Sequence, residues 1–450
     1  MNSFTLVFLI ALTLSFSVQF WLAKRHADYV AKHRIAVPEA FKNTVSLEAH
    51  QKAADYTLEK SRLGNIDSII GVILLLVMTL GGGINWAFQF WAAAVQSPLI
   101  AGLAALASVF LVMTALEIPT SVYQTFVIEE KYGFNKSTPQ QFIKDQLLQL
   151  VLIAVIGMPL LALILWVMDS IGSLWWLWAW GILISFSLLM SWLYPTVIAP
   201  LFNKFTPMEE GSLKHRIQGL LARCGFSSQG IFIMDGSKRS GHGNAYFTGL
   251  GNNKRIVFFD TLINSLDDEE LEAILAHELG HFKCKHTIKM LVANAVMTLV
   301  SFAVLGWLIG QQWFYNGLGV EQPSHAAALL LFMLVSSSFT FFIQPIIAYF
   351  QRKFEFEADN FASNNAKAEK LISALVKLFE ENASTLTPDP LYSAFHYSHP
   401  PAAIRIANLE SQIRPAYDCM DAGGTTPRMG EVESRLEQRS RATQEQLPND

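Results

Sequence analysis

Apolar residues fall in long blocks along the chain, and most charged residues lie in the segments between these blocks. Seven of the blocks reach the roughly 20 residues that an α-helix needs to cross the hydrocarbon core of a bilayer. They extend over about 4–23, 68–91, 98–121, 147–168, 173–199, 288–312 and 326–350. This pattern predicts an all-α, multi-pass membrane protein with seven transmembrane helices.

Composition supports the membrane assignment. The 450 residues are 52% hydrophobic and only 16% charged, which is too apolar for an ordinary soluble protein. The first block has the position of a secretion signal, but no basic region precedes it, and Lys24 and Arg25 follow it as they follow a retained helix. We therefore expect an uncleaved first span. The net charge of -4 argues against a nucleic-acid partner.

The distribution of lysine and arginine predicts the orientation. Lysine follows span three, lysine and arginine together follow spans one, five and seven, and both are absent from the connectors 92–97, 169–173 and 311–325. Segments rich in these residues face the cytoplasm. The amino terminus is therefore predicted to lie outside, and the long segment between spans five and six is predicted to be cytoplasmic.

This cytoplasmic segment contains the motif HELGH, His277 to His281. In a chain of this composition, chance produces such a motif about once in a hundred sequences. Acidic residues and helically spaced apolar residues precede it, so the run that begins at Ser265 is predicted to be a capped helix. On this helix His277 and His281 lie one turn apart, where two imidazoles can bind one zinc ion, and Glu278 can act as a general base toward water.

A zinc site of this kind needs a third protein ligand. One class of zinc peptidases uses a histidine six residues after the second, with glycine midway, but Thr287 and Cys284 exclude that class. The alternative is a carboxylate in QRKFEFEADNFAS, directly after span seven. There Glu355 can bind the metal, and Asp359, one turn later, can hydrogen-bond a zinc-binding histidine. Glu357 points about 200° away from Glu355 and is the weaker candidate. Cys284 is interpreted as a filler residue rather than as a ligand.

Two further stretches carry candidate chemistry. SGHGNAYFTG followed by NNKRIVFFD predicts a strand, a turn and a second strand just before the HELGH helix. Because peptidases often hold substrate as an added strand, Asn244 and the backbone around Ala245 are candidates for substrate binding, with a plain hairpin as the alternative. In FHYSHPP, His396 or His399 could stabilise an oxyanion, and a structural role for both is the alternative.

Together these motifs resemble the CAAX prenyl protease type 1 family of integral-membrane zinc metalloproteases. The resemblance rests on HELGH, EFEAD, SKRSGHGNAYFTG, FHYSHPP, FVIEEKYGFNKST and IAPLFNKFTP, and it extends from about the second span to residue 412. It implies a barrel of seven helices around a water-filled chamber, with a zincin-like catalytic domain on the cytoplasmic side. It also implies a role for each candidate residue: His277, His281 and Glu355 as ligands of a single zinc ion, Glu278 as general base, Asp359 as hydrogen-bond partner of the ligands, Asn244 near the substrate and His399 as stabiliser of the transition state.

The predicted elements divide the chain into successive parts. These are 1–203 with spans one to five, 204–287 with the HELGH core and a small β-hairpin or sheet, 288–350 with spans six and seven, 351–420 as the remainder of the catalytic domain, and 421–450 as a polar, disordered tail.

The predicted function is a zinc endopeptidase that cleaves carboxyl-terminal CAAX-like segments, prenylated or not, or other membrane-associated proteins. A bacterial inner membrane is favoured over the endoplasmic reticulum, because the chain ends in LPND without a basic retrieval signal. One alternative is a heat-shock-type quality-control zinc protease, for which fewer spans are expected. Another is a channel or scaffold with a vestigial metal site. An intramembrane protease conflicts with the polar flanks DDEELE and KCKH. The oligomeric state stays open.

Overall fold

The structure is a computed structural model that describes residues 2–226, 228–248 and 255–421. The tail predicted to be disordered lies outside these residues from 422 onward. Within them, seven helical segments are long and apolar enough to span a membrane, which confirms the predicted number. The segments are Ser3–His33, Leu47–Met78, Pro98–Glu129, Pro139–Ser170, Gly172–Phe202, His286–Leu308 and His325–Asn365.

Several of these spans consist of more than one helical element. A π-helical turn continues α4, and similar short turns join α5 to α6, α7 to α8, and α14 to α15. The helices of the spans are α1 (Ser3–His33), α2 (Leu47–Met78), α4 (Pro98–Tyr123) with η2 (Gln124–Glu129), α5 (Pro139–Leu152), α6 (Met158–Ser170), α7 (Trp175–Leu193), α8 (Ala199–Phe202), α12 (His286–Leu308), α14 (His325–Thr340) and α15 (Gln344–Asn365).

The second span differs from its predicted bounds of about 68–91. Helix α2 ends at Met78, and the chain turns through Thr79 to Gly82 before α3 (Gly83–Ala94) begins. Gly82 has φ of 82°, a left-handed conformation that favours glycine. A Cβ at Gly81 would lie 2.5 Å from the carbonyl oxygen of Val77. The apolar block therefore contains a turn, and the span extends instead toward Leu47.

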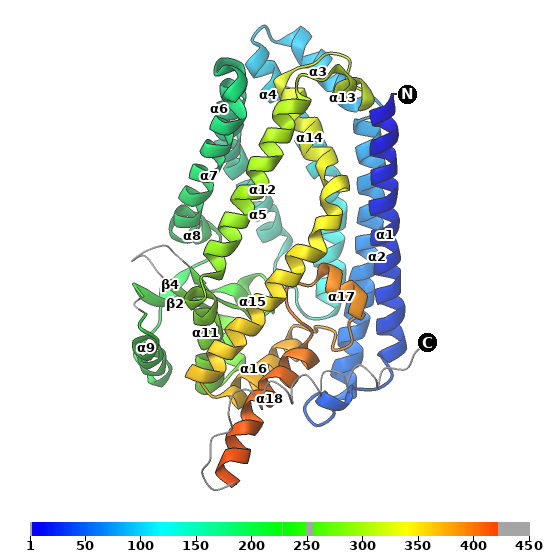
Figure 1. Cartoon of the computed structure of the whole chain (residues 1–450). Helices are drawn as coiled ribbons and strands as arrows, with labels where there is room; N and C mark the ends of the chain where they lie inside the picture. Colours follow the sequence, from blue (N-terminus) through cyan, green and yellow to red (C-terminus); the bar gives the residue numbers. More distant parts are fainter. Residues whose placement is uncertain (1, 227, 249–254, 422–450) are drawn as a thin grey trace.

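The connectors without lysine or arginine lie at one end of the spans. The short helices α3 and α13 (Gln312–Gly317) lie there, at the top of Figure 1, whereas the sheet and helix α11 (Asp268–Lys283) lie toward the bottom. Phe8, Leu106 and Phe314 are buried between the spans. Large apolar side chains such as Trp86 and Val155 remain exposed, as expected where lipid takes the place of protein neighbours.

The segment between spans five and six contains a four-stranded sheet in the order β1-β2-β4-β3. Its strands are β1 (Phe205–Pro207), β2 (Gly230–Met234), β3 (Ala245–Thr248) and β4 (Arg255–Phe259). β3 and β4 are antiparallel, which confirms the predicted pair of strands, although the turn between them lies outside the described residues. β1 and β2 were not predicted. Among the described residues β3 is an edge strand, with β4 as its sole neighbour.

Helix α11 packs in a second core, formed by the sheet, α9 (Ser212–Cys224) and α16 (Ala368–Glu381). Phe258 of β4, Leu271 and Leu275 of α11, Ile217 of α9 and Leu371 of α16 are buried there. Burying each such side chain fully stabilises the fold by about 1.5–3 kcal/mol. The helix that carries HELGH is therefore held on several sides. The helices α17 (Pro390–His396) and α18 (Ala402–Asp421) pack against its neighbour α15, and α18 also packs against α16.

Candidate metal centre and active site

Helix α11 begins with a complete capping box. The Asp267 side chain accepts hydrogen bonds from the backbone N–H groups of Glu269 and Glu270, and the Glu270 carboxylate accepts one from the N–H of Asp267. The prediction that this helix begins at Ser265 was wrong, because Ser265 is the last residue of the separate helix α10 (Asp260–Ser265). A cap of this type contributes about 1 kcal/mol to helix stability.

Helices α11 and α15 cross in close contact and bring the motif residues together. A Cβ at Gly280 would lie 2.9 Å from the Cα of Ala358, so the crossing requires glycine at this position. His277, His281 and Glu355 each offer one ligand atom, and these atoms all lie within 4.8 Å of one another. The three residues predicted as metal ligands therefore form one cluster.

The spacing within this cluster fits a tetrahedral metal ion. His277 Nε2 and His281 Nε2 are 3.2 Å apart, and the Glu355 carboxylate oxygens lie 3.2 Å from His281 Nε2 and 3.5 Å from His277 Nε2. Ligand atoms about 2.1 Å from a tetrahedral ion are about 3.4 Å apart. Glu355 Oε2 is buried and makes no hydrogen bond among the described residues, although Arg405 Nη1 lies 3.4 Å from it as an ion-pair partner. A bound cation would satisfy this oxygen.

A buried charge pair, Asp359 and Arg405, holds His277 at its second ring nitrogen, Nδ1. Its Nδ1 lies 2.8 Å from Asp359 Oδ1, and Arg405 holds Asp359 through contacts of 2.6 and 2.9 Å. Burial alone would lower the pKa of His277, but hydrogen bonds to Asp359 and Glu355 outweigh it and raise this pKa to about 9. A metal ion must therefore displace a proton in order to bind at neutral pH.

Arg405 was missed in the sequence. Its Nη1 lies 3.4 Å from Glu355 Oε2, so it contacts both carboxylates that face His277. It occupies a lone basic position in the apolar run AAIRIANL of α18. That position is the signal that could have identified it, because an arginine on the buried face of a helix needs an acidic partner.

Glu278 lines a cavity of about 1140 Å³ that extends from the metal cluster to spans α1 and α2. On the side of the spans, Phe16, Phe20 and Asn65 contribute to its lining. Burial raises the pKa of the Glu278 carboxyl above its usual range. A carboxyl group in this position is suited to accept a proton from water and to release it again.

His399 and Asn244 line the same cavity. His399 Nε2 lies 3.5 Å from Glu355 Oε1, and its Nδ1 is 2.9 Å from Ser398 Oγ. The imidazole is open to the cavity but enclosed by protein, and this burial lowers its pKa. Asn244 immediately precedes the edge strand β3, and its side-chain oxygen accepts a hydrogen bond from the N–H of Ala245. Every predicted site residue thus belongs to the metal cluster, contacts it or lines its cavity, while their individual roles stay predictions.

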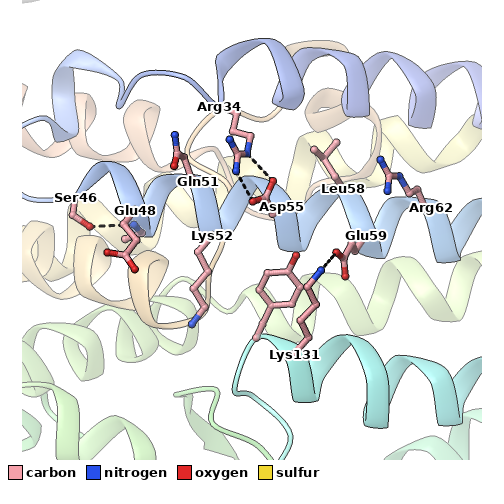
Figure 2. A pocket seen from close by; sticks show the side chains of 12 residues that line it. Arg34, Ser46, Glu48, Gln51, Lys52, Asp55, Leu58, Glu59, Arg62 and Lys131 are labelled. Carbon is pink, nitrogen blue, oxygen red and sulfur yellow. Dashed lines mark hydrogen bonds and ion pairs between the residues drawn. The ribbon is translucent and has the colours of Figure 1, made fainter.

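Figure 2 shows a second cavity, of about 650 Å³, lined mostly by residues of α2, together with Arg34 just after α1 and Lys131 and Tyr132 from the segment after η2. Arg34 pairs with Asp55 there, and Lys131 pairs with Glu59. Its lining includes no member of the metal cluster. Because this cavity lacks the metal cluster and two of its acidic residues are already paired with basic ones, we assign the chemistry to the first cavity.

Comparison with known proteins agrees with this geometry. Residues 26–204 match the family model for the CAAX prenyl protease N-terminal, five membrane helices, and residues 207–413 match peptidase family M48. A CAAX prenyl protease 1 homolog of Oryza sativa subsp. japonica is 34% identical over 409 residues, which cover 88% of this chain and 96% of the relative. The Homo sapiens homolog is 31% identical over 459 residues, with 90% and 95% coverage. The crystal structure of S. mikatae Ste24p matches with a TM-score of 0.83 and 31% identity over 91% of this chain and 99% of that one.

Proposed function

Because the chain belongs to the CAAX prenyl protease 1 family of M48 peptidases and is a membrane-embedded metalloprotease, we propose that its metal is one zinc ion held by His277, His281 and Glu355. The observation that carries this proposal is the convergence of two imidazole nitrogens on the buried Glu355 carboxylate, whose Oε2 makes no hydrogen bond among the described residues. Two histidines and a glutamate are a frequent ligand set of catalytic zinc. Bound zinc would activate a water molecule and polarise the scissile carbonyl.

Glu278 is the general base of the proposed reaction. Its carboxylate takes a proton from the attacking water and passes that proton to the amide nitrogen of the leaving product. The raised pKa of this carboxyl makes its carboxylate a stronger base and so favours uptake of the proton from water. Asp359 and Arg405 keep His277 in position while the reaction proceeds.

The substrate peptide is proposed to lie along the edge strand β3. Backbone N–H and C=O groups on the open edge of a strand can pair with an extended peptide, and Asn244 lies at the end of that edge. His399, which contacts Glu355 and lines the same cavity, can donate a hydrogen bond to the developing oxyanion.

The substrate class is proposed to be carboxyl-terminal CAAX-like segments, prenylated or not, and other membrane-associated proteins. Two features support it: the relatives are CAAX prenyl proteases by name, and the cavity joins the metal cluster to apolar side chains of the span α1. We further propose that the site opens to the cytoplasm, since lysine and arginine concentrate on that side. The bacterial inner membrane stays a prediction.

Glu278→Gln tests the proposed function. The purified full-length variant should bind one zinc ion per chain, as the wild type does, while kcat falls by about a thousandfold or more on a peptide with a carboxyl-terminal CAAX-like sequence. The peptide is supplied with and without a farnesyl group, and the two kcat/KM values decide whether a lipid is required. Undiminished turnover by the variant would remove Glu278 from the proposed role.

A further inference from the structure

The imidazole of His286 lies between His281 and the carboxylate of Glu357. His286 Nδ1 is 3.0 Å from His281 Nδ1, and His286 Nε2 is 3.0 Å from Glu357 Oε2. The ring is only 3% exposed and stacks on Phe354 with a centroid distance of 4.3 Å. Both of its nitrogens are therefore engaged, and packing keeps the ring in this orientation.

The chain reaches this arrangement through an uncommon turn between α11 and α12. Lys285 has φ of 57° and ψ of 34°, a left-handed conformation that is rare for a residue other than glycine. The reversal places His286, the first residue of α12, against His281 of the preceding helix. Backbone strain of this type costs about 1–3 kcal/mol and persists where the surroundings enforce it.

The hydrogen-bond chain has one consistent proton assignment when His281 binds a metal through Nε2. A neutral imidazole with a ligating Nε2 carries its proton on Nδ1, so His281 donates to His286 Nδ1. A neutral His286 then carries its own proton on Nε2 and donates it to Glu357. The chain from Glu357 to His281 thus gives the second ligand histidine an outer partner, as Asp359 does for His277.

We propose that His286 and Glu357 are positioning residues for the metal centre: they hold His281 in the tautomer and the ring orientation that aim Nε2 at the bound zinc ion. This inference rests on the proposed zinc site. It assigns a use to Glu357, which sequence periodicity had placed on a different face from Glu355, and to a histidine outside HELGH.

A second cation site is the competing interpretation of the same residues. Cys284, His286 and Glu357 each offer a ligand atom, and these atoms lie within 4.8 Å of one another. A metal ion bound by His286 would have to replace its contact with His281 or its contact with Glu357, because both ring nitrogens are already used. The hydrogen-bond chain requires no such loss, and the number of bound zinc ions separates the two interpretations.

The test measures zinc binding rather than turnover. Full-length protein in detergent is titrated against a chromophoric zinc chelator, which gives the Kd and the number of ions bound. His286→Leu should raise the Kd about 10–100-fold. His286→Gln should keep the Kd within about threefold, because its carbonyl can accept from His281 and its amide can donate to Glu357. Lys289→Met is the matched control, since Lys289 contacts Glu357 at 3.5 Å but is not part of the hydrogen-bond chain from His281 to Glu357. The zinc Kd of this variant should equal that of the wild type.

Three results would overturn the proposal. The first is an unchanged zinc Kd in His286→Leu. The second is an equal loss of zinc affinity in the Leu and Gln variants, which would indicate that packing alone matters. The third is two bound zinc ions in the wild type, one of which is lost in His286→Leu. Cobalt substitution provides a spectroscopic check, since the d–d bands should shift in His286→Leu and not in His286→Gln. Peptide cleavage is measured separately, so a failure of the proposed function would appear as absent turnover by zinc-loaded wild type, whereas the Kd ratio decides the role of His286.

Discussion

Gly280 of α11 and Ala358 of α15 meet with their backbones in direct contact. A Cβ at Gly280 would lie 2.9 Å from the Cα of Ala358 and 3.0 Å from its carbonyl oxygen. Neither atom can move without moving the whole of α15. This contact sets the distance between the helix that carries His277 and His281 and the helix that carries Glu355, so the fourth residue of HELGH controls the geometry of the metal cluster.

Gly280→Ala is therefore expected to separate the two helices. Overpacking at such a contact costs about 1–3 kcal/mol, and a displacement of about 0.5 Å is enough to impair a preorganised site. We expect a lower Tm and a zinc Kd that rises at least about tenfold, measured by thermal unfolding and by chelator competition. Gly219→Ala in α9 is the matched control, because its Cβ would make only an ordinary 3.5 Å contact with Arg223. That variant should keep its Kd.

The features that the sequence predicted well are those encoded in local patterns. The spans are continuous apolar blocks, and His277 and His281 share a helix face through spacing alone. The second span, whose bounds were predicted wrongly, shows the limit of this approach. Hydropathy does not reveal that the apolar block contains a left-handed turn at Gly82.

The features that were missed depend on contacts between distant segments. Arg405 becomes part of the site because α18 packs against α15, and His286 does so because Lys285 reverses the chain. The segment of Arg405 signals only that this buried arginine needs an acidic partner, and neither segment shows which distant residues it contacts. Glu355 and Asp359 could be predicted as a pair because they have a helical spacing, and the presence of HELGH favoured a joint role over a solvated helix face.

Arg405→Met should destabilise the protein more than the loss of a surface arginine. It leaves Asp359 and Glu355 buried without their cationic neighbour, and breaking a buried ion pair in this way costs about 3–5 kcal/mol. The expected result is a large drop in Tm that added zinc partly reverses, because the metal ion neutralises the same carboxylates. Arg216→Met is the control and should cost at most about 1 kcal/mol, since Arg216 is itself partly exposed and its buried partner Glu272 keeps a second ion pair with Arg223. Equal effects of the two variants would contradict the buried network.

Zinc binding should strengthen as the pH rises toward 9. The pKa of His277 is raised from 6.5 to about 9, so below pH 9 the metal-free imidazole holds a proton that zinc must displace. The Kd is expected to fall about tenfold per pH unit between pH 7 and pH 9 and to level off above. Chelator competition across this range, corrected for the protonation of the chelator, measures the slope. Asp359→Asn removes a carboxylate that raises this pKa, so its Kd should level off at lower pH. A wild-type Kd that is constant from pH 7 to pH 9 would contradict the assignment.

His399→Ala should lower kcat without weakening metal binding. His399 Nε2 lies 3.5 Å from Glu355 Oε1 and is open to the cavity, where it can donate to an oxyanion but is not needed to complete the metal cluster. Loss of one oxyanion donor costs about 10²–10³ in kcat. Steady-state cleavage of the CAAX-like peptide, with zinc Kd measured in parallel, tests this expectation.

His396→Ala is the matched control from the same segment, because His396 Nε2 is buried without a hydrogen-bond partner among the described residues, and its imidazole contacts Tyr392 and Phe341 instead. A fall in kcat of similar size in both variants would indicate that the FHYSHPP segment acts through its fold, and a loss of zinc in His399→Ala would make His399 a ligand.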